Sequence, residues 1–479
     1  MIEQRKLNLL MDFYELTMAH GYFEQNRHLE VAVFDVFFRN VPDRGGYAIF
    51  AGLEQVIEYI ESLSFSDEEV AFLRNKKMFS EAFLQYLKSF RFSSDVYAMK
   101  EGTPIFPHEP IIIVKGPIIE CQLIETMILL TINHQSLIAT KSARIVRAAK
   151  GRAVMEFGAR RAQGYDAAVY GARAAYIGGV MGSSNTIVDY QFGIPALGTM
   201  AHSYVQSYKT EYEAFLSYAQ VYPENTVLLV DTYNTLNEGI PNAIRIHNEY
   251  LKPRGHALRG IRLDSGDLTY LTKKAREMLD EAGLTTTKIT VSNALDEYLI
   301  RELLHQGAKI DSFGVGERLI TARSESVFGG VFKLTAMEED GKIVPKIKIS
   351  ENVQKTTIPG FKQVYRMMDQ NNKAIADVIT LHDEVIDESK PYRLFDPLFP
   401  WKDKIIENYK AVPLLTKIFD KGTLIYKKPN LSEIRKHSQT NLQTLWEEVL
   451  RQENPHQYYV DLSQKLYDLR RKMINEERK

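Results

Sequence analysis

From about residue 152 to 316 the chain repeats one pattern, in which a short apolar run leads into a polar or glycine-bearing corner and then into a helical stretch. Six such units follow one another, and IDSFGVG supplies a seventh apolar run. Strands that alternate with helices of about ten or more residues predict parallel βαβ units. Seven parallel strands favour an α/β barrel, and a doubly wound open sheet is the alternative that periodicity does not exclude.

The segments on either side of this repeat show other patterns. Residues 1–140 mix helical stretches with β-like runs such as VAVFDVFFRN, which predicts an N-terminal α/β domain. Residues 327–395 contain apolar runs joined by EEDGK and DQNNK, typical of antiparallel hairpins, and we expect this segment to dock back on the N-terminal domain. Residues 396–479 are charged and predicted to be mostly helical, which leaves 141–326 for the barrel-like catalytic domain.

Composition mainly excludes other classes of protein. With 479 residues, 25% of them charged, and a net charge of -1, the chain is typical of a globular protein of more than one domain and gives no bias toward nucleic acid. The lone Cys121 excludes an internal disulfide and a cysteine-rich zinc site. The N-terminus lacks a signal-peptide pattern, and no apolar run reaches the roughly 18 residues that span a bilayer. We therefore expect a cytoplasmic protein without membrane or nucleic-acid partners.

A basic ridge, interpreted as a solvated helix face, consists of Lys141, Arg144, Arg147 and Lys150.

The strand ends of the repeat carry the candidate chemistry, because an α/β barrel places its active site at the carboxyl ends of its strands. Small residues there let backbone amides approach an anion, which predicts a phosphate site, although a tight turn is the alternative for GVG. The polar and glycine residues at these ends are Glu156, Arg160, Arg161, Ser183, Ser184, Asn185, His202, Ser203, Asp231, Thr232, Arg262, Asp264, Ser265, Asp267, Ser292, Asn293, Gly314 and Gly316.

The charged members of this set suggest two kinds of ligand. Asp231, Asp264 and Asp267 suit Mg²⁺, which uses few carboxylates and shares phosphate oxygens, and helix capping is the alternative, above all for Asp267. Arg160, Arg161 and Arg262 are candidates for forked recognition of a carboxylate or phosphate, and structural ion pairs are the alternative.

His202 lies between the apolar run IPALGTM and a helical stretch that begins at about Ser203. A neutral imidazole is nucleophilic toward phosphorus and is largely unprotonated near pH 7. We therefore predict that His202 accepts a phosphoryl group or orients the substrate, with a capping or buried histidine as the alternative. Metal ligation is less favoured because no HxH or HxxxH pattern surrounds it.

Eight stretches along essentially the whole chain together resemble the nicotinate phosphoribosyltransferase family, in that family's order. The resemblance implies a type II phosphoribosyltransferase fold, with an irregular TIM-like α/β barrel and an N-terminal α/β domain, and a homodimer with shared active sites. The stretches are DFYELTMAHGYF (12–23), FRNVPDRGGY (38–47), EFGARRAQG (156–164), MGSSNT (181–186), GTMAHSY (198–204), VDTYNT (230–235), IRLDSGDL (261–268) and FGVGERL (313–319).

The resemblance also implies a reaction. In the family, ATP hydrolysis is coupled to the condensation of nicotinate with 5-phosphoribosyl 1-pyrophosphate, which gives nicotinate mononucleotide, pyrophosphate, ADP and phosphate for NAD salvage. By match, His202 would become phosphorylated. Ser184 lies where nicotinamide-specific relatives carry Asp, so it would spare the nicotinate carboxylate a repulsion.

The same match assigns the remaining roles. Tyr14 of the neighbouring subunit would stack on the pyridine ring with Phe157 on its other face, and Arg262 would hold the carboxylate. The further assignments are Arg39, Arg160 and Lys333 for phosphate or pyrophosphate, Asp231 and Asp264 for the ribose hydroxyls and Mg²⁺, Ser183, where Thr is common, for substrate, and the amides of Ser292, Asn293, Gly314 and Gly316 for the 5-phosphate.

Three rival interpretations stay open. A nicotinamide-preferring enzyme would carry Asp at 184, and a quinolinate-type phosphoribosyltransferase would need neither ATP nor a phosphorylated histidine. A catalytically silent scaffold on the same fold would have lost His202, Asp264 or Arg262, all of which are present.

Overall fold

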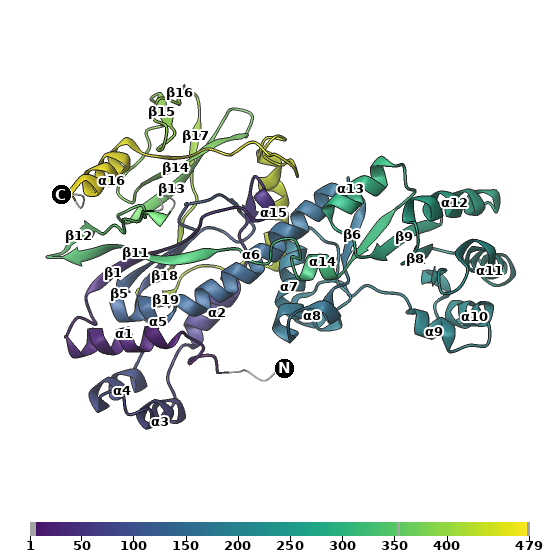
Figure 1. The fold of residues 1–479 in the computed structure, drawn as a ribbon, viewed down its shortest axis with the longest axis horizontal. Helices are drawn as coiled ribbons and strands as arrows, with labels where there is room; N and C mark the ends of the chain where they lie inside the picture. Colours follow the sequence, from purple (N-terminus) through teal and green to yellow (C-terminus); the bar gives the residue numbers. More distant parts are fainter. Residues whose placement is uncertain (1–5, 352–354, 477–479) are drawn as a thin grey trace. The chain divides into compact units, whose positions relative to one another are not determined.

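The computed structural model describes residues 6–351 and 355–476, and Figure 1 shows its elements in chain order. The chain divides into two compact units, which are described separately below. Unit 1 comprises residues 1–137 and 327–479, and unit 2 comprises residues 138–326. The domain boundaries expected from the sequence, near residues 140, 326 and 395, stay a prediction.

Unit 1 is built around a seven-stranded antiparallel sheet with the order β12-β11-β1-β5-β3-β18-β19. β1 lies inside it and is buried along nearly its whole length, which its apolar run VAVFDVFF makes favourable. The strands are β1 (Val31–Phe38), β3 (Asp95–Ala98), β5 (Ile112–Pro117), β11 (Gly330–Glu339), β12 (Lys342–Pro345), β18 (Thr416–Asp420) and β19 (Thr423–Leu424).

A second sheet of unit 1 has four strands in the order β17-β13-β14-β20. The two hairpins predicted at EEDGK and DQNNK are confirmed, because β11 pairs with β12 and β13 pairs with β14, both antiparallel. The strands of this sheet and of two small pairs are β13 (Lys362–Met368), β14 (Ala374–Leu381), β17 (Lys410–Pro413), β20 (Val460–Leu462), β15 (Tyr392–Phe395) with β16 (Asp403–Ile406), and β2 (Ala48–Ile49) with β4 (Pro104–Ile105).

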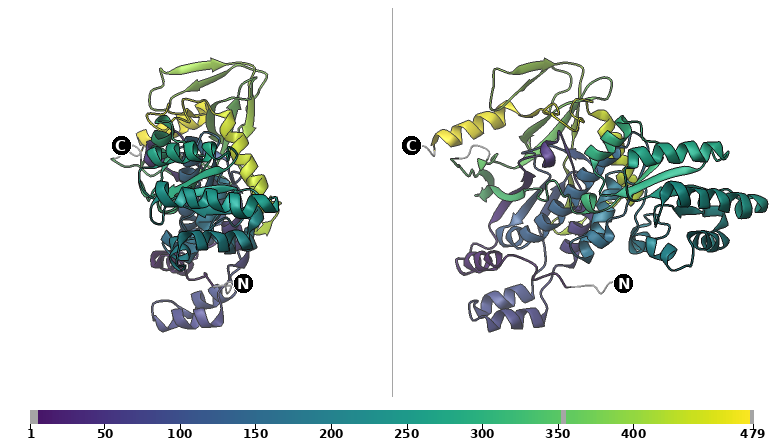
Figure 2. Two further views of the ribbon diagram at one scale, coloured as in Figure 1. Left: turned by 90° about the vertical axis from the view of Figure 1, so that its right-hand side faces the viewer. Right: turned by 45° about the vertical axis from the view of Figure 1, so that its right-hand side comes forward.

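Three helices of unit 1, namely α3, α4 and α15, begin with a side-chain cap. α3 begins with a complete capping box between Ser66 and Glu69, and it packs against α4, as both views of Figure 2 show. None of the helices in the described part of the chain combines the length and apolarity needed to cross a membrane. The elements are α1 (Phe13–Glu24), η1 (Pro42–Arg44), α2 (Leu53–Ser62), α3 (Asp67–Asn75), α4 (Glu81–Lys88), α5 (Ile118–Leu123), α15 (Leu431–Thr444) and α16 (Gln464–Glu476).

The C-terminal segment differs from its prediction. Residues 396–479 were expected to be mostly helical, yet they contain strands β16 to β20 besides α15 and α16. β17 pairs with β13, β18 with β3, and β20 with β14. The prediction is wrong there because these short strands pair with partners far away in the sequence, which local periodicity does not reveal.

Unit 2 contains a five-stranded, all-parallel sheet with the order β6-β10-β9-β8-β7. It follows the predicted βαβ pattern, so the carboxyl ends of its strands meet at one edge. The strands are β6 (Ala153–Glu156), β7 (Val227–Leu229), β8 (Gly260–Leu263), β9 (Lys288–Asn293) and β10 (Ser312–Val315).

A closed barrel is not found among the described residues. Two of the seven expected strands are reduced to isolated bridges, Glu156 with Ser183 and Ser183 with Ala196, and β7 pairs only with β8. The run IPALGTM forms no ladder and pairs only at the Ser183–Ala196 bridge, where the Ser183 amide donates to the Pro195 carbonyl and the Leu197 amide donates to the Ser183 carbonyl.

The helices of unit 2 follow the strands closely. The helix expected from residue 203 is split into α9 and α10, because Thr210 caps a new helix by accepting from the Glu213 amide. The second half of α6 (Glu125–Ala148) also belongs to this unit. The other elements are η2 (Ala159–Arg161), α7 (Tyr165–Ile177), α8 (Thr186–Phe192), α9 (His202–Gln206), α10 (Glu211–Val221), η3 (Pro223–Asn225), η4 (Thr235–Gly239), α11 (Ile240–Ile246), η5 (His247–Leu251), η6 (Lys252–Arg254), α12 (Leu268–Glu281), α13 (Glu297–His305) and α14 (Glu317–Ile320).

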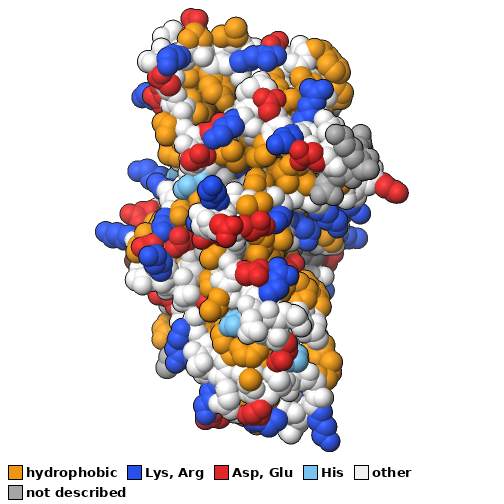
Figure 3. All heavy atoms as spheres, turned by 90° about the vertical axis from the view of Figure 1, so that its left-hand side faces the viewer, with side chains coloured by type: hydrophobic (Ala, Val, Ile, Leu, Met, Phe, Trp, Pro, Cys, Tyr) orange, Lys and Arg blue, Asp and Glu red, His pale blue; other side chains and the backbone are white. Residues whose placement is uncertain are grey.

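The surface carries charges of both signs. On the face drawn in Figure 3, basic and acidic side chains are intermingled, with apolar side chains between them. This matches the nearly neutral chain, whose net charge is -1.

Candidate active site

His202 and Asp231 form the centre of the candidate site in unit 2. His202 is the first residue of α9, and its Nε2 lies 3.2 Å from Oδ1 of Asp231, just after β7. The Asp231 side chain is 1% exposed and that of His202 is 37% exposed. A buried carboxylate therefore holds one nitrogen of an imidazole that solutes can still reach.

A chain of hydrogen bonds continues from Asp231 across two further strand ends. Oδ2 of Asp231 accepts from the backbone N of Asp264 and from Oγ of Ser265, each at 2.7 Å. Oδ1 of Asp264 accepts from Oγ of Ser292 at the end of β9. The carboxyl ends of β7, β8 and β9 are thus connected through side chains. Within the described residues nothing donates to Oδ2 of Asp264, which is left to bind a ligand.

Arg262 is a half-buried cation at the end of β8. Its Nη1 donates to Oγ1 of Thr199 at 2.9 Å, whereas its buried Nε has no hydrogen-bond partner in the described structure. Burial lowers the pKa of Arg262, and the charges of Asp264 and Asp231 oppose that effect. Because a buried unpaired donor is costly, this guanidinium is prepared to bind an anion.

Glu156 and Ser183 form a buried pair at the end of β6. Oγ of Ser183 donates to Glu156 at 2.5 Å, and the amide of Gly158 donates to the same carboxyl group. Burial raises the pKa of Glu156. Ser183 is fully buried, so its hydroxyl is engaged inside the protein, whereas the neighbouring Ser184 is exposed.

Phe157 explains why two predicted site residues are glycines. A Cβ at Gly314 would lie 2.5 Å from the Phe157 ring, and one at Gly316 would lie 2.9 Å from the Phe157 carbonyl oxygen. Both glycines therefore allow β10 to approach the Phe157 backbone and ring. Packing against Phe157 therefore favours glycine at both positions, independently of the phosphate contacts predicted for them.

Three further site residues that the sequence predicted in unit 2 are Asn293, Arg160 and Asp267. Asn293 ends β9 with a φ of 132°, a conformation that L-residues rarely adopt, and its Oδ1 accepts from the Ala294 amide at 2.6 Å. Arg160 is exposed in η2, and its charge acts on Arg262. Asp267 caps α12 by accepting from the Tyr270 amide at 2.9 Å, which confirms the alternative stated for it.

Three predicted residues, Tyr14, Arg39 and Lys333, belong to unit 1, and two of them, Tyr14 and Lys333, interact with Glu125. The charge of Glu125 acts on Tyr14, to which it is hydrogen-bonded, and on Lys333. Burial lowers the pKa of Lys333, the charge of Arg39 lowers it further, and Nζ of Lys333 donates to the Phe332 carbonyl at 2.8 Å.

Sequence reasoning missed Thr199 and Glu125. Thr199 lies within the GTMAHSY stretch, so its position three residues before His202 was a usable signal. Glu125 lies in a helix without any motif, and only the fold brings it to Tyr14.

Comparisons with known proteins agree along the whole chain. The model of the nicotinate phosphoribosyltransferase N-terminal domain matches residues 9–133, the family model residues 152–385 and the C-terminal domain model residues 361–470. The nicotinate phosphoribosyltransferase of Bacillus subtilis is 46% identical over 473 residues, which cover 98% of this chain and 96% of that protein. The nicotinate phosphoribosyltransferase of Dictyostelium discoideum is 35% identical, and the match covers 96% of this chain and 87% of that protein.

Solved structures give the same result. A crystal structure of human nicotinic acid phosphoribosyltransferase matches with a TM-score of 0.86 and 28% identity, over 97% of this chain and 99% of that one. A nicotinate-nucleotide pyrophosphorylase from Pyrococcus furiosus matches with a TM-score of 0.70 over 91% of this chain and 95% of that one. At 24% identity, the second likeness shows the fold alone.

Proposed function

The chain belongs to the nicotinate phosphoribosyltransferase family, and from this premise we propose that it transfers the phosphoribosyl group of 5-phosphoribosyl 1-pyrophosphate to nicotinate. The products are nicotinate mononucleotide and pyrophosphate, which places the enzyme in NAD salvage. ATP is the co-substrate and is converted to ADP and phosphate, as in an ATP-dependent ligase. The observation that supports this most is the His202–Asp231 pair beside Arg262 and Asp264, at the ends of adjacent parallel strands.

His202 accepts the phosphoryl group in this proposal. A carboxylate only accepts hydrogen bonds, so the proton of the neutral imidazole lies on Nε2 toward Asp231, and Nδ1 carries the lone pair. Nδ1 attacks the γ-phosphorus of ATP, the N–P bond forms, and the bond to the ADP oxygen breaks. Asp231 stabilises the positive charge that develops on the ring. Water later cleaves the N–P bond and releases phosphate.

Nicotinate binds through its carboxylate and its ring. Arg262 offers the carboxylate a buried guanidinium whose Nε lacks a protein partner within the described residues. Phe157 contacts one face of the pyridine ring and Tyr14 of the partner subunit the other, an assignment that rests on the family resemblance. The Ser184 hydroxyl avoids a like-charge repulsion that an Asp would impose, worth roughly 4 kcal/mol at 4 Å with an effective dielectric constant of 20.

Stabilisation of the leaving pyrophosphate dominates catalysis, because the sugar carbon passes through a cation-like transition state. Arg39, Arg160 and Lys333 contact the phosphates, and the pyridine nitrogen attacks without a general base. The backbone amides of Ser292 and Asn293 at the end of β9, of Gly314 in β10 and of Gly316 directly after it hold the 5-phosphate.

A magnesium ion fits this site through Asp264, whose Oδ2 accepts no hydrogen bond within the described residues. When bound, Mg²⁺ neutralises charge on the pyrophosphate. Asp231 fits less well as a ligand because both of its oxygens are engaged. The enzyme works in the cytoplasm as a homodimer with shared active sites.

A pyrophosphate-release assay tests the proposed activity. Nicotinate, nicotinamide and quinolinate are each offered with 5-phosphoribosyl 1-pyrophosphate and Mg²⁺, with and without ATP. We expect turnover with nicotinate only, raised by ATP and accompanied by ADP. Equal turnover with nicotinamide would contradict the role of Ser184, turnover with quinolinate that is indifferent to ATP would favour the quinolinate-type activity, and no turnover would favour the silent scaffold.

The role of His202 is tested by His202→Ala, with His305→Ala, an exposed histidine at the end of α13, as the matched control. We expect His202→Ala to lose ATP stimulation and ADP formation while the control retains both. A His202→Ala enzyme that kept ATP-stimulated turnover would disprove the phosphohistidine.

A further inference from the structure

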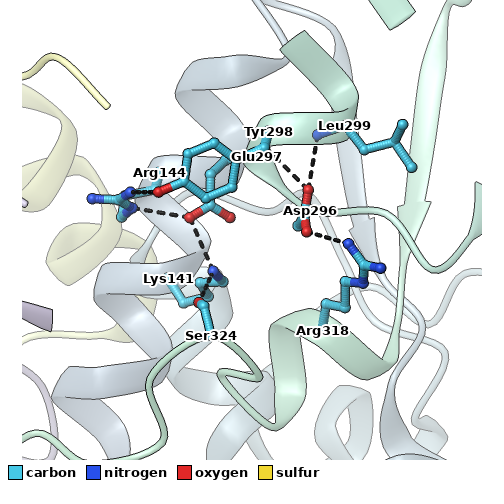
Figure 4. A network of polar contacts seen from close by, with 8 residues as sticks. All are labelled: Lys141, Arg144, Asp296, Glu297, Tyr298, Leu299, Arg318 and Ser324. Atoms are coloured by element: carbon cyan, nitrogen blue, oxygen red, sulfur yellow. Dashed lines mark hydrogen bonds and ion pairs between the residues drawn. The ribbon is translucent and has the colours of Figure 1, made fainter. Parts of the chain in front are cut away.

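Asp296, at the start of α13, connects the chain that leaves β9 with the chain that leaves β10. Its Oδ1 caps α13 by accepting from the amides of Tyr298 at 3.1 Å and Leu299 at 2.8 Å. Its Oδ2 accepts from Nη1 of Arg318, which lies in α14 directly after β10 (Figure 4). One carboxylate therefore fixes both a helix start and a residue of the neighbouring loop.

Glu297, the next residue, makes a second connection between the same two segments. Its fully buried Oε1 accepts from Nζ of Lys141 at 2.9 Å and from Nε of Arg144 at 3.1 Å. Nζ of Lys141 also donates to Oγ of Ser324 at 2.6 Å, in the chain that follows α14 (Figure 4). Arg144 donates from Nη2 to the Tyr298 hydroxyl at 3.1 Å, which anchors α13 on α6.

These contacts correct the interpretation of the basic ridge on α6. Lys141 and Arg144 were interpreted as part of a solvated face, yet their side chains are only 3% and 5% exposed. Their partner Glu297 lies 156 residues beyond Lys141, so helical spacing alone could not reveal the pairing.

The connected segments directly follow the strand ends that the proposed function assigns to the 5-phosphate. β9 and β10 are paired from Ser312 with Thr290 up to Val315 with Asn293, and that ladder ends there. Of the residues assigned to the 5-phosphate, Ser292, Asn293 and Gly314 lie in this ladder and Gly316 follows it directly. Beyond the ladder the two strands no longer pair, and the Arg318–Asp296 contact joins the two segments there. A phosphate held by amides at both strand ends needs their separation to stay within a fraction of an ångström.

We propose that the Arg318–Asp296 pair is a positioning device for the site of the 5-phosphate, holding the loop after β9 and the loop after β10 at a fixed separation. The proposal rests on the proposed function, which places the 5-phosphate at the ends of β9 and β10. Nη1 of Arg318 donates to a carboxylate that balances its charge, while its buried Nε has no partner within the described residues, so Arg318 acts through Asp296 in this proposal.

Substitutions at Arg318 and Asp296 separate this role from simple stability. Arg318→Met removes the pair, Arg318→Lys keeps a cation, and Asp296→Asn keeps a capping oxygen for α13 while removing the negative charge. The matched control is Lys288→Met, because Lys288 pairs with Asp311 at 3.0 Å and so joins the same two strands at their amino ends.

The measurement compares two inhibitors, ribose 5-phosphate and pyrophosphate, in each purified full-length variant. We expect Arg318→Met and Asp296→Asn each to weaken ribose 5-phosphate binding about tenfold and to raise the KM for the phosphoribosyl donor similarly, with pyrophosphate inhibition and kcat changed less than about threefold. Arg318→Lys should recover most of the affinity, the double variant should add little, and Lys288→Met should bind like the unmodified protein.

Three results would overturn the proposal. They are unchanged ribose 5-phosphate binding in Arg318→Met, equal weakening of both inhibitors in a variant with an unchanged melting temperature, and weakening by Lys288→Met as large as by Arg318→Met. Binding of ribose 5-phosphate is measured by calorimetry, which needs no turnover. Failure of the proposed activity, seen as no reaction of the unmodified protein with nicotinate, is therefore distinguishable from failure of the positioning role.

Discussion

Two arginines, the buried Arg366 of unit 1 and the half-buried Arg262 of unit 2, show how this protein uses charge in opposite ways. In unit 1, Arg366 makes a bidentate pair with Asp377 at 2.8 and 2.6 Å and donates to the Pro104 carbonyl at 2.9 Å. In unit 2, Arg262 has one hydrogen bond, to Thr199, and a buried Nε without a partner in the described structure. Although burial opposes it, Asp377 raises the pKa of Arg366, whereas burial lowers that of Arg262.

The contrast between the two arginines indicates which group serves the fold and which serves a ligand. Around Arg366 the protein supplies the counter-charge itself, and burial together with the charge of Asp377 raises the pKa of Glu109 well above its ordinary range. This shift favours the protonated form of Glu109, which leaves Asp377 as the carboxylate that balances the guanidinium. Each guanidinium has one buried nitrogen without a partner in the described structure, Nη1 in Arg366 and Nε in Arg262. Unlike Arg366, however, Arg262 makes no ion pair within the described residues, and it lies at a strand end where an incoming carboxylate supplies the missing counter-charge.

The strongest change in stability should come from Arg366→Met, which leaves the Asp377 carboxylate buried without its cation. We expect unit 1 to lose about 3–5 kcal/mol of unfolding free energy, since breaking one side of a buried pair has that effect. Both tryptophans, Trp401 and Trp446, belong to unit 1, so urea unfolding followed by tryptophan fluorescence reports on this unit.

The control for this measurement is Arg27→Met, which removes an exposed pair with Glu30 in the same unit and whose arginine side chain is 52% exposed. It should change stability by less than about 0.5 kcal/mol. A loss below about 1 kcal/mol in Arg366→Met would mean that the buried pair contributes no more than a surface contact.

Arg262→Met should show the reverse behaviour, with the effect on substrate binding rather than on folding. We expect the KM for nicotinate to rise about 100-fold, equivalent to roughly 2.7 kcal/mol, because a charge-assisted contact to the carboxylate is lost. The tryptophan-reported transition of unit 1 should not change. Arg259→Met, at the amino end of β8, is the matched control, because this exposed arginine donates to the Glu224 carbonyl and lies outside the site.

An unchanged KM for nicotinate in Arg262→Met would show that the unpaired Nε is not the carboxylate receptor. A KM change shared by Arg259→Met would point instead to a general disturbance of β8.

Local sequence features predicted some elements of the fold well. The hairpins at EEDGK and DQNNK are specified by turn residues between alternating runs, so no distant partner is needed to recognise them. The parallel order of unit 2 likewise follows from alternating strand and helix patterns. His202, Asp231, Asp264 and Arg262 meet because each ends or follows a strand of that series, or begins the helix after it.

Long-range partners could not be predicted in the same way. The sequence does not show that Lys141 pairs with Glu297, nor that β17 and β18 pair with strands more than forty residues before them. The prediction of a closed barrel failed for a related reason, because an apolar run becomes a strand only if a neighbouring segment pairs with it. Thr199 and Glu125 act through contacts that only the folded chain creates.

The smallest effect on stability is expected at Glu15. This buried carboxyl is next in the sequence to Tyr14, which is predicted to bind the substrate, so its burial has two competing explanations, the fold and the substrate. Oε1 of Glu15 accepts from the Thr126 amide at 3.1 Å, and its buried Oε2 has no partner in the described structure. Burial raises the pKa of Glu15 to about 7. Since an unfolded Glu titrates near 4.3, the folded state favours the protonated form, and this contribution to stability is present below that pH and is lost as the pH rises to about 7.

Glu15→Gln removes this titration while keeping a neutral group of the same shape. We expect the variant to exceed the unmodified protein in unfolding free energy by on the order of 1 kcal/mol at pH 8 and to approach it near pH 4, with nicotinate KM unchanged. Tryptophan-monitored urea unfolding at both pH values measures this, with the exposed Glu68→Gln of α3 as the control. If the KM for nicotinate changed and the pH dependence of stability did not, Glu15 would belong with Arg262, as a group whose burial serves the substrate rather than the fold.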